Sequence, residues 1–303
     1  MTDGKMAAAI RRASRNGTAF FTANQLYAAY ASRAGGRPKW AGPVLGFAAL
    51  ISLGTIASFG QGEILSGISW LLFSLPFFWL GIFYRSKPVR PAMFASWIDL
   101  WLRSGKTIDG LIQQPSLHQP PPQWSEQDIY DYGVERILIV QHDLLVDLFV
   151  RNGLHAEQRA LVISESGYPS YLMAVTKRLL EERPDLPVFA FHDADAQGQA
   201  MMQRLFSMDL PLKGRPITDL GMRPEQFKKS KRTRSYDPYS TDRDLPADAM
   251  PVPMLAAGLG ACFAAGAAQE LLGNDGNAPG GDEAALTVGF GAGDYSIGGE
   301  DFG

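Results

Sequence analysis

Two uncharged apolar runs, separated by four residues, constrain this chain more than any other feature. Residues 41–59 read AGPVLGFAALISLGTIASF, and residues 64–84 read ILSGISWLLFSLPFFWLGIFY. Each run is close to the ~20 apolar residues that a helix needs to cross a bilayer. Pro76 and the glycines are tolerated in membrane helices. We therefore predict a transmembrane hairpin. The alternative is a buried hairpin in a soluble core, which a domain this small has little room to enclose.

The charges beside the two runs predict the orientation of this hairpin. Lys and Arg are absent from the connecting turn, residues 60–63. They are frequent on the outer sides, at Arg11, Arg12, Arg15, Arg33, Arg37, Lys39, Arg85, Lys87 and Arg90. Basic residues near membrane helices favour the cytoplasmic side. We expect a multi-pass protein of the inner (plasma) membrane, with both termini and the soluble domain in the cytoplasm.

The remaining chain divides by composition. The net charge of -3 argues against a chain that is basic throughout, and the single cysteine, Cys262, excludes an intramolecular disulfide. We predict these parts: a cytoplasmic helical segment 1–40, the transmembrane hairpin 41–84, a juxtamembrane helix and Pro-rich linker 85–125, an α/β domain 126–235, a linker and apolar small-residue helix 236–273, and a Gly-rich acidic disordered tail 274–303.

The α/β domain alternates apolar strands with helices. Strands are predicted at 136–140, 160–164 and 187–191, and helices at 143–152, 169–182 and 196–206. Continuous apolar strands between helices are typical of a parallel sheet that is covered on both faces. The later apolar helix, residues 254–268, either packs on this domain or the anchor, or forms a third span.

Two aspartates follow the third strand. Asp193 and Asp195 stand where ligands bind in open α/β sheets, beyond the carboxyl ends of the strands. Carboxylates there suit Mg2+, which prefers oxygen ligands and stabilises charge on phosphoryl groups. The alternative is that the pair forms a helix N-cap and a solvated turn.

Several motifs of this domain occur in an order that is known from one protein family. Gly167-Tyr168-Pro169 follows the second strand, Thr176-Lys177-Arg178 lies in the next helix, and Leu186-Pro187-Val188 opens the third strand. That strand leads to Asp193-Ala194-Asp195, and Arg215–Pro224 is similar to a further strand. Over roughly residues 130 to 230 the order resembles the Toprim domain of the topoisomerase VI A subunit and the related meiotic double-strand-break enzyme. The resemblance implies a Toprim-like (Rossmann-like) parallel sheet, with Asp193 and Asp195 as metal ligands.

The chain departs from that family at the end of its first strand. The family has a catalytic Glu there, whereas this chain has Gln141, followed by His142 and Asp143. A neutral amide is a poor Mg2+ ligand and no general acid or base. Glu165, after the adjacent strand, either supplies a replacement carboxylate or is a solvated loop residue.

The family's nucleophile also has no clear counterpart. Family members cut DNA with a tyrosine on a winged-helix domain, and the nearest local match is Tyr27, which Ala follows. The apolar runs begin too soon after it for a winged helix, so we interpret Tyr27 as a packing residue. His142 and His192 end two strands at one edge, where they either contact a metal or phosphate or have packing and hydrogen-bonding roles.

A basic cluster lies at residues 227–234, FKKSKRTR. Its Lys228, Lys229, Lys231 and Arg232 are candidates for phosphates of nucleic acid or for anionic lipid headgroups, and a solvated loop is the alternative. No aromatic residue is interleaved within the run, which argues against nucleic acid.

The leading hypothesis from these patterns is a membrane-anchored, divergent Toprim-like protein. It would bind Mg2+ and a phosphate-containing ligand, with nucleic acid among the candidates, and would have weak or no catalysis. Two alternatives stay open: an active, Mg-dependent nuclease or phosphotransferase tethered to the membrane, and a non-catalytic membrane scaffold.

Overall fold

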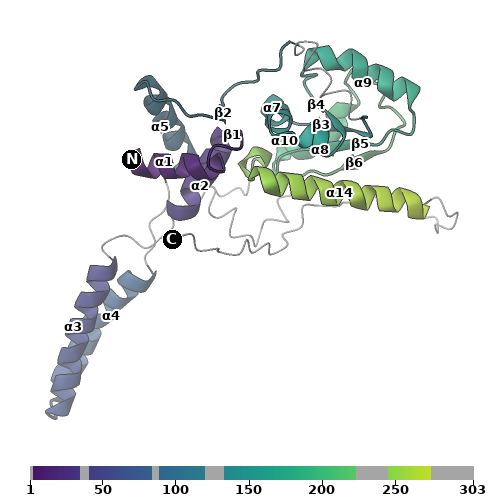
Figure 1. Ribbon diagram of the computed structural model, residues 1–303. Coiled ribbons are helices and arrows are strands. Elements are labelled where there is room, and N and C mark those ends of the chain that lie inside the picture. The colour runs from purple at the N-terminus through teal and green to yellow at the C-terminus, as the bar shows by residue number, and fades with distance from the viewer. Residues whose placement is uncertain (1–2, 35–40, 84–88, 120–132, 223–244, 274–303) are drawn as a thin grey trace. The chain divides into compact units, whose positions relative to one another are not determined.

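The computed structural model describes residues 3–34, 41–83, 89–119, 133–222 and 245–273. The chain forms two compact units (Figure 1). The first comprises residues 1–30 and 90–303, and the second comprises residues 31–89. The first unit thus joins the N-terminal helices to the α/β domain, a connection that the sequence patterns do not indicate.

A four-stranded parallel sheet forms the centre of the first unit. Its strands lie in the order β4-β3-β5-β6. They are β3 (Arg136–Val140), β4 (Ala160–Ser164), β5 (Val188–Phe191) and β6 (Ile217–Asp219). All three neighbouring pairs are parallel, and Ile137 is paired with both Leu161 and Val188. The predicted parallel-sheet α/β domain is therefore confirmed, and β6 falls within the segment 215–224.

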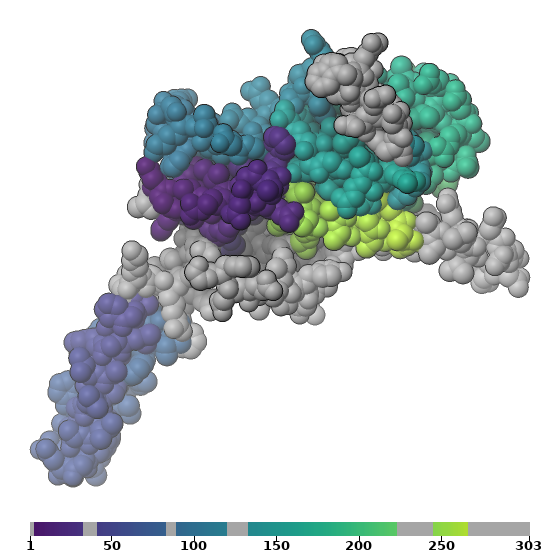
Figure 2. All heavy atoms as spheres, in the orientation of Figure 1, coloured from purple at the N-terminus to yellow at the C-terminus, as the bar shows by residue number. Residues whose placement is uncertain are grey.

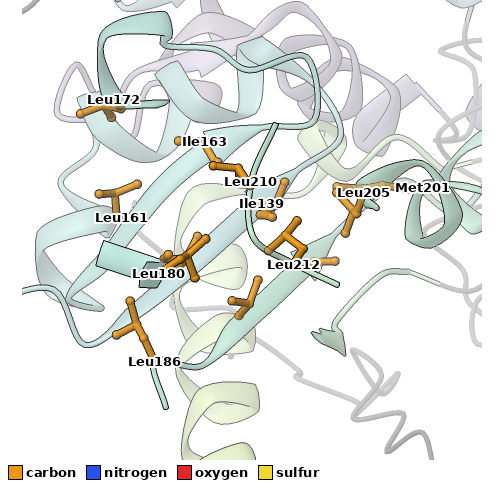
Figure 3. Packing of buried hydrophobic residues seen from close by; sticks show 13 residues of the cluster. Ile139, Leu161, Ile163, Leu172, Leu180, Leu186, Met201, Leu205, Leu210 and Leu212 are labelled. Atoms are coloured by element: carbon orange, nitrogen blue, oxygen red, sulfur yellow. The ribbon is translucent and has the colours of Figure 1, made fainter. Parts of the chain in front are cut away.

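Helices cover both faces of this sheet because successive side chains of a strand point to opposite sides. One face contributes Ile139, Leu161 and Ile163 to a buried cluster with α9 (Ser170–Glu182) and α11 (Met201–Leu205) (Figure 3). On the other face, Phe191 contacts Phe149 of α7 (Asp143–Arg151), with 6.1 Å between ring centroids. Two short helices, α8 (Leu154–Glu157) and α10 (Ala196–Gln199), complete this part.

The apolar helix α14 (Val252–Gly273) packs on the second face of the sheet. The ring of Phe263 meets the ring of Phe189 edge-on, with 4.7 Å between centroids, and the Arg136 guanidinium lies over the Phe263 ring. Figure 2 shows α14 in green along the teal sheet domain. This arrangement agrees with the first interpretation of the segment, a helix packed on the domain.

The N-terminal segments form a small helical subdomain. It contains α1 (Asp3–Ala13), α2 (Ala23–Ala34), α5 (Pro91–Arg103) and a parallel pair of two-residue strands, β1 (Phe21–Thr22) and β2 (Leu111–Ile112). The buried ring of Tyr27 contacts Phe94 of α5, with 5.4 Å between centroids. Tyr27 is therefore a packing residue in this structure, as the sequence suggests.

A buried carboxylate attaches the segment after β2 to the sheet domain. Asp147 of α7 is fully buried and accepts hydrogen bonds from the Ser116 backbone N–H and hydroxyl and from the Tyr168 hydroxyl. The same Tyr168 hydroxyl accepts a hydrogen bond from the Leu117 N–H. Tyr168, part of the Gly-Tyr-Pro motif, thus helps to fix residues 116 and 117 on the sheet domain.

The second unit is a hairpin of two apolar helices, α3 (Ala41–Gly60) and α4 (Ile64–Phe83). Phe47 meets Phe77 edge-on at 5.3 Å, and the Ser58 and Ser66 hydroxyls lie 3.2 Å apart. By length and composition both helices are able to span a membrane, and only 22% and 17% of their apolar windows are buried. Core helices of soluble proteins can have the same length and composition, so the structure defines a hairpin of apolar helices.

Candidate functional site

Polar residues gather at the carboxyl edge of the sheet because the parallel strands all end on that side. Gln141 and His142 follow β3, Glu165 follows β4, and His192 to Asp195 follow β5. The edge is covered by residues 245–250, which we call the closing segment. The sequence therefore indicates that these side chains share one edge of the sheet, and the structure decides what each of them contacts there.

Asp193 is held on every side by its own chain. Its side chain is only 10% exposed. One carboxylate oxygen, Oδ1, accepts a hydrogen bond from the Ala247 N–H at 2.8 Å. The other, Oδ2, accepts one from His142 Nε2 at 3.0 Å. This hydrogen bond raises the pKa of His142 above its ordinary value, so the imidazolium that would balance the Asp193 charge is favoured.

Gln141 contacts Asp193 through its amide. The buried Oε1 atom of Gln141 accepts a hydrogen bond from the Asp193 backbone N–H at 2.8 Å. A glutamate could accept the same bond, but it would put a second negative charge beside the buried Asp193 carboxylate, where like charges are costly. The amide therefore suits a site that is closed without a cation.

Asp195 is a helix cap. Its Oδ1 atom accepts a hydrogen bond from the Gly198 N–H at 2.5 Å, at the N-terminus of α10. A side-chain oxygen in this position satisfies one of the unpaired N–H groups of the first helical turn. This geometry corresponds to the N-cap alternative for the aspartate pair.

Glu165 forms an ion pair with Arg204 of α11. Arg204 Nη2 lies 2.9 Å from Oε1 and 3.0 Å from Oε2 of the glutamate. Such two-oxygen contacts to a guanidinium are geometrically specific and strong. In this structure the Glu165 carboxylate is engaged by Arg204.

His192 is a buried side chain of the same edge. Its Nδ1 lies 2.7 Å from the Asp193 carbonyl oxygen, and its Nε2 lies 3.2 Å from Asp219 Oδ1. Both neighbours are acceptors, so a ring with two N–H groups matches them. Burial by itself lowers the pKa of His192, but the hydrogen bonds to Asp219 and the Asp193 carbonyl outweigh it and raise the pKa.

The closing segment connects this edge to the N-terminal subdomain. Ala194 N–H donates to the Leu245 carbonyl at 3.1 Å, which adds to the bond between Ala247 and Asp193. On its other side, the Asp248 carboxylate accepts from Asn24 Nδ2 at 2.8 Å. Gln25 Nε2 donates to the Met250 carbonyl at 2.6 Å. Burial raises the pKa of Asp248 to about 6.

These residues do not fit a Mg2+ site. Among the residues that the structure describes, no group of three His, Cys, Asp or Glu side chains is arranged to hold a metal. Mg2+ requires near-octahedral oxygen ligands, whereas both Asp193 oxygens accept internal hydrogen bonds and Asp195 caps α10. The candidate phosphate ligands Lys228, Lys229, Lys231 and Arg232 lie outside the described residues.

A family model supports the assignment of the domain. The model of the Toprim domain shared by the topoisomerase 6 A subunit and Spo11 matches residues 136–214, from the start of β3 to just before β6. This part of the chain is thus a Toprim-like domain of that family, and it covers 79 of 303 residues. No curated protein and no solved structure matches the chain. Toprim domains imply metal- and nucleic-acid-related function in general.

Sequence reasoning did not find several residues of this edge. Asp248, Asn24 and Gln25 come from segments more than two hundred residues apart, and no local motif marks them. Asp219 had a weak signal, since it lies in the segment 215–224 that resembles a family strand. Its contact with His192 depends on the order of β5 and β6 in the sheet.

Proposed function

We propose that this chain is a membrane-anchored, non-catalytic protein that uses its Toprim-like domain as a binding or scaffolding module. The observation that carries the proposal is the Asp193 carboxylate, which accepts hydrogen bonds from Ala247 and His142 on its two oxygens. A side chain in this state stabilises the fold of its own chain. The carboxyl edge of the sheet, where the family binds metal, would then serve as the contact between the sheet domain and the closing segment.

Most acid and base groups that the structure describes at this edge are engaged within the chain, which supports the non-catalytic part. His142, whose side chain is half exposed, is paired with Asp193. Gln141 cannot transfer a proton, and Glu165 is paired with Arg204. Asp195 is engaged as a helix cap. Phosphoryl transfer depends on positioned charge around the reacting group, and the charge of Glu165 is matched by Arg204 within the chain.

The surface of the apolar hairpin supports the membrane anchor. Large apolar side chains point outward along both helices, at Leu50, Leu53, Ile56, Leu65, Leu72 and Trp79. Contiguous apolar surface of this kind is uncommon on soluble monomers. The Lys and Arg residues outside the hairpin favour a cytoplasmic location of the Toprim-like domain and both termini, by the positive-inside rule.

Thermal unfolding of the full-length protein in detergent, with and without millimolar Mg2+ or Mn2+, tests the proposal. A ligand that binds only the folded state raises its stability, so we expect no metal-dependent rise in Tm. Asp193→Asn should lower the stability by about 1.5–3 kcal/mol with or without metal, because a hydrogen bond to a charged group is lost. Asp209→Asn, at a highly exposed aspartate, is the matched control.

The second candidate is a protein that binds Mg2+ and a phosphate-containing ligand, such as nucleic acid, at Asp193 and Asp195. The family match to residues 136–214 favours it. In that case the metal must displace His142 and Ala247 from Asp193. A metal-dependent rise in Tm that Asp193→Asn abolishes and Asp209→Asn retains would support this candidate and refute the proposed closed site. Nuclease activity that Glu165→Gln lowers would support the catalytic version.

A further inference from the structure

The exposed edge of α5 has an apolar middle and basic ends. Met93 and Leu100 are 53% and 67% exposed, and Trp97 lies between them in sequence. Residues spaced by four and three positions share one face of a helix. Arg90 precedes the helix and Arg103 ends it. We call these five residues the α5 strip.

The opposite side of α5 packs against α2 within the N-terminal subdomain. Phe94 and Ile98 are buried, and the Phe94 ring stacks on Tyr30 of α2, with 5.0 Å between centroids. Trp97 also contacts Tyr30 edge-on, at 6.3 Å. Consecutive helical residues are 100° apart, so the acidic Asp99 points away from the direction of Leu100. The α5 strip is thus held in place, with Met93 and Leu100 outward and Trp97 half-buried against Tyr30.

The charge around α5 complements an anionic surface. Residues 3–32 and 89–112 contain seven Lys or Arg and three Asp, a net charge of +4. Residues 133–222 of the sheet domain contain nine Lys or Arg and twelve Asp or Glu, a net charge of -3. One of the basic residues, Lys106, is paired with Asp3. The positive charge is therefore concentrated in the N-terminal subdomain that includes α5.

Chain connectivity limits how far α5 can be from the apolar hairpin. Seven residues separate the end of α4 at Phe83 from the start of α5 at Pro91. Even a fully extended connection from Phe83 to Pro91 spans no more than about 29 Å. Six residues separate α2 from α3 in the same way. If the hairpin spans a bilayer, these short connections keep both α2 and α5 near the membrane surface.

We propose that the α5 strip docks on the surface of an anionic lipid bilayer. Met93 and Leu100 enter the boundary of the acyl chains, and Trp97 lies at headgroup level, where its amphipathic ring is favoured. Arg90 and Arg103 contact lipid phosphates. The inference rests on the proposed membrane anchor and adds a second contact to it, which would hold the N-terminal subdomain on the membrane.

Spin labels at single cysteines test this docking in the full-length protein. The background variant is Cys262→Ala, and the protein is reconstituted in phosphatidylcholine vesicles with or without phosphatidylglycerol. Leu100→Cys and Met93→Cys report the α5 strip, and Asp99→Cys on the neighbouring exposed side is the matched control. Leu72→Cys, on an outward side chain of α4, reports insertion of the hairpin independently.

With phosphatidylglycerol present, we expect the labels at 93 and 100 to be accessible to oxygen and shielded from a water-soluble nickel complex. The label at 99 should stay accessible to nickel. Arg103→Gln should shift the ratio of docked to undocked protein about fivefold toward the undocked form, since one basic residue contributes about that much near an anionic surface. High salt should also shift the ratio toward the undocked form, because it screens the attraction between the basic residues and the anionic surface.

Two outcomes would overturn the inference in distinguishable ways. If the label at 72 is embedded in lipid while those at 93 and 100 are as accessible to nickel as the label at 99, the docking is refuted and the anchor stands. If the label at 72 is itself accessible to nickel, the anchor and the docking are both refuted.

Discussion

At the scale of single residues, His192 is enclosed by two glycines that have no room for a methyl group. A Cβ atom on Gly221 would lie 1.8 Å from His192 Nε2. A Cβ atom on Gly198 would lie 2.3 Å from the Asp193 carbonyl oxygen. Both glycines are therefore needed for close packing around a buried imidazole. Gly198 follows the aspartate pair, and Gly221 lies in the segment 215–224 that resembles a family strand.

Gly221→Ala should destabilise the protein, because the new methyl group overlaps the His192 ring. Overpacking a closely packed site costs typically 1–3 kcal/mol, and we expect at least the middle of that range in chemical denaturation of the full-length protein. Gly260→Ala is the control, since its Cβ would meet Gln158 at an ordinary 3.5 Å and alanine favours the helix. A Gly221→Ala protein as stable as the Gly260→Ala protein would contradict the tight packing around His192.

Asp248 predicts a specific pH dependence of stability. Its pKa of about 6 in the folded protein lies above the ordinary value. Between about pH 4 and 6 the folded protein holds a proton that the unfolded chain has released, so the unfolding free energy falls as the pH rises. A shift of two units corresponds to about 3 kcal/mol. His142 and His192, whose pKa values are also raised, act in the same direction as the pH rises further.

Asp248→Asn should remove the part of this dependence that lies between about pH 4 and 6. The new amide still accepts the hydrogen bond from Asn24, so at pH 7 the variant should be more stable than the parent. Denaturation series at several pH values measure this, with Asp209→Asn as the exposed control. Parallel curves for the parent and Asp248→Asn would show that Asp248 does not titrate as the structure implies.

At the scale of elements, the closing segment and α14 act together on the sheet domain. The closing segment covers the carboxyl edge, and α14 follows it directly and covers one face. Neither lies within the residues that match the Toprim family model. The Toprim-like domain of this chain is therefore completed by a C-terminal addition that is buried against it.

Phe263→Ala tests the role of α14 in the soluble fold. Phe263 is buried against Phe189, so its loss should cost about 3–5 kcal/mol in the unfolding free energy. Phe206→Ala, at a side chain that is 43% exposed, should have a much smaller effect. If both variants are equally stable, α14 does not pack on the sheet domain, and the result would favour the alternative that this helix is a third membrane span.

At the scale of the whole molecule, the apolar hairpin and the charge distribution predict a topology. An impermeant maleimide should label Gln61→Cys in the connecting turn from outside intact cells, and should label Lys213→Cys only after permeabilisation. The physical reason is the positive-inside rule, since the turn has no Lys or Arg. The buried native Cys262 is removed as a control. Labelling of position 213 in intact cells would contradict the cytoplasmic location of the Toprim-like domain.

The sequence alone predicts the features that depend on local pattern. Continuous apolar runs predict β3, β4 and β5, because burial on both faces of a strand leaves no polar alternation. Helical spacing predicts α9, because burial on one face of a helix leaves a 3.6-residue period. Motif order predicts the Toprim-like domain, which the family match confirms. The helix predicted at 196–206 instead forms α10 and α11, which meet at Ala200, two residues after Gly198.

Only the tertiary structure decides the state of the candidate site. The sequence presents Asp193, Asp195 and Glu165 as three carboxylates near one edge. Their chemistry depends on partners that lie far away in the chain: Ala247 for Asp193 and Arg204 for Glu165. A carboxylate that accepts hydrogen bonds or an ion pair from its own chain stabilises the fold, and one without such partners is available to a cation. Packing decides which of these partners lie beside it. Local pattern determines where the strands end, and long-range contacts determine what the side chains at those ends can bind.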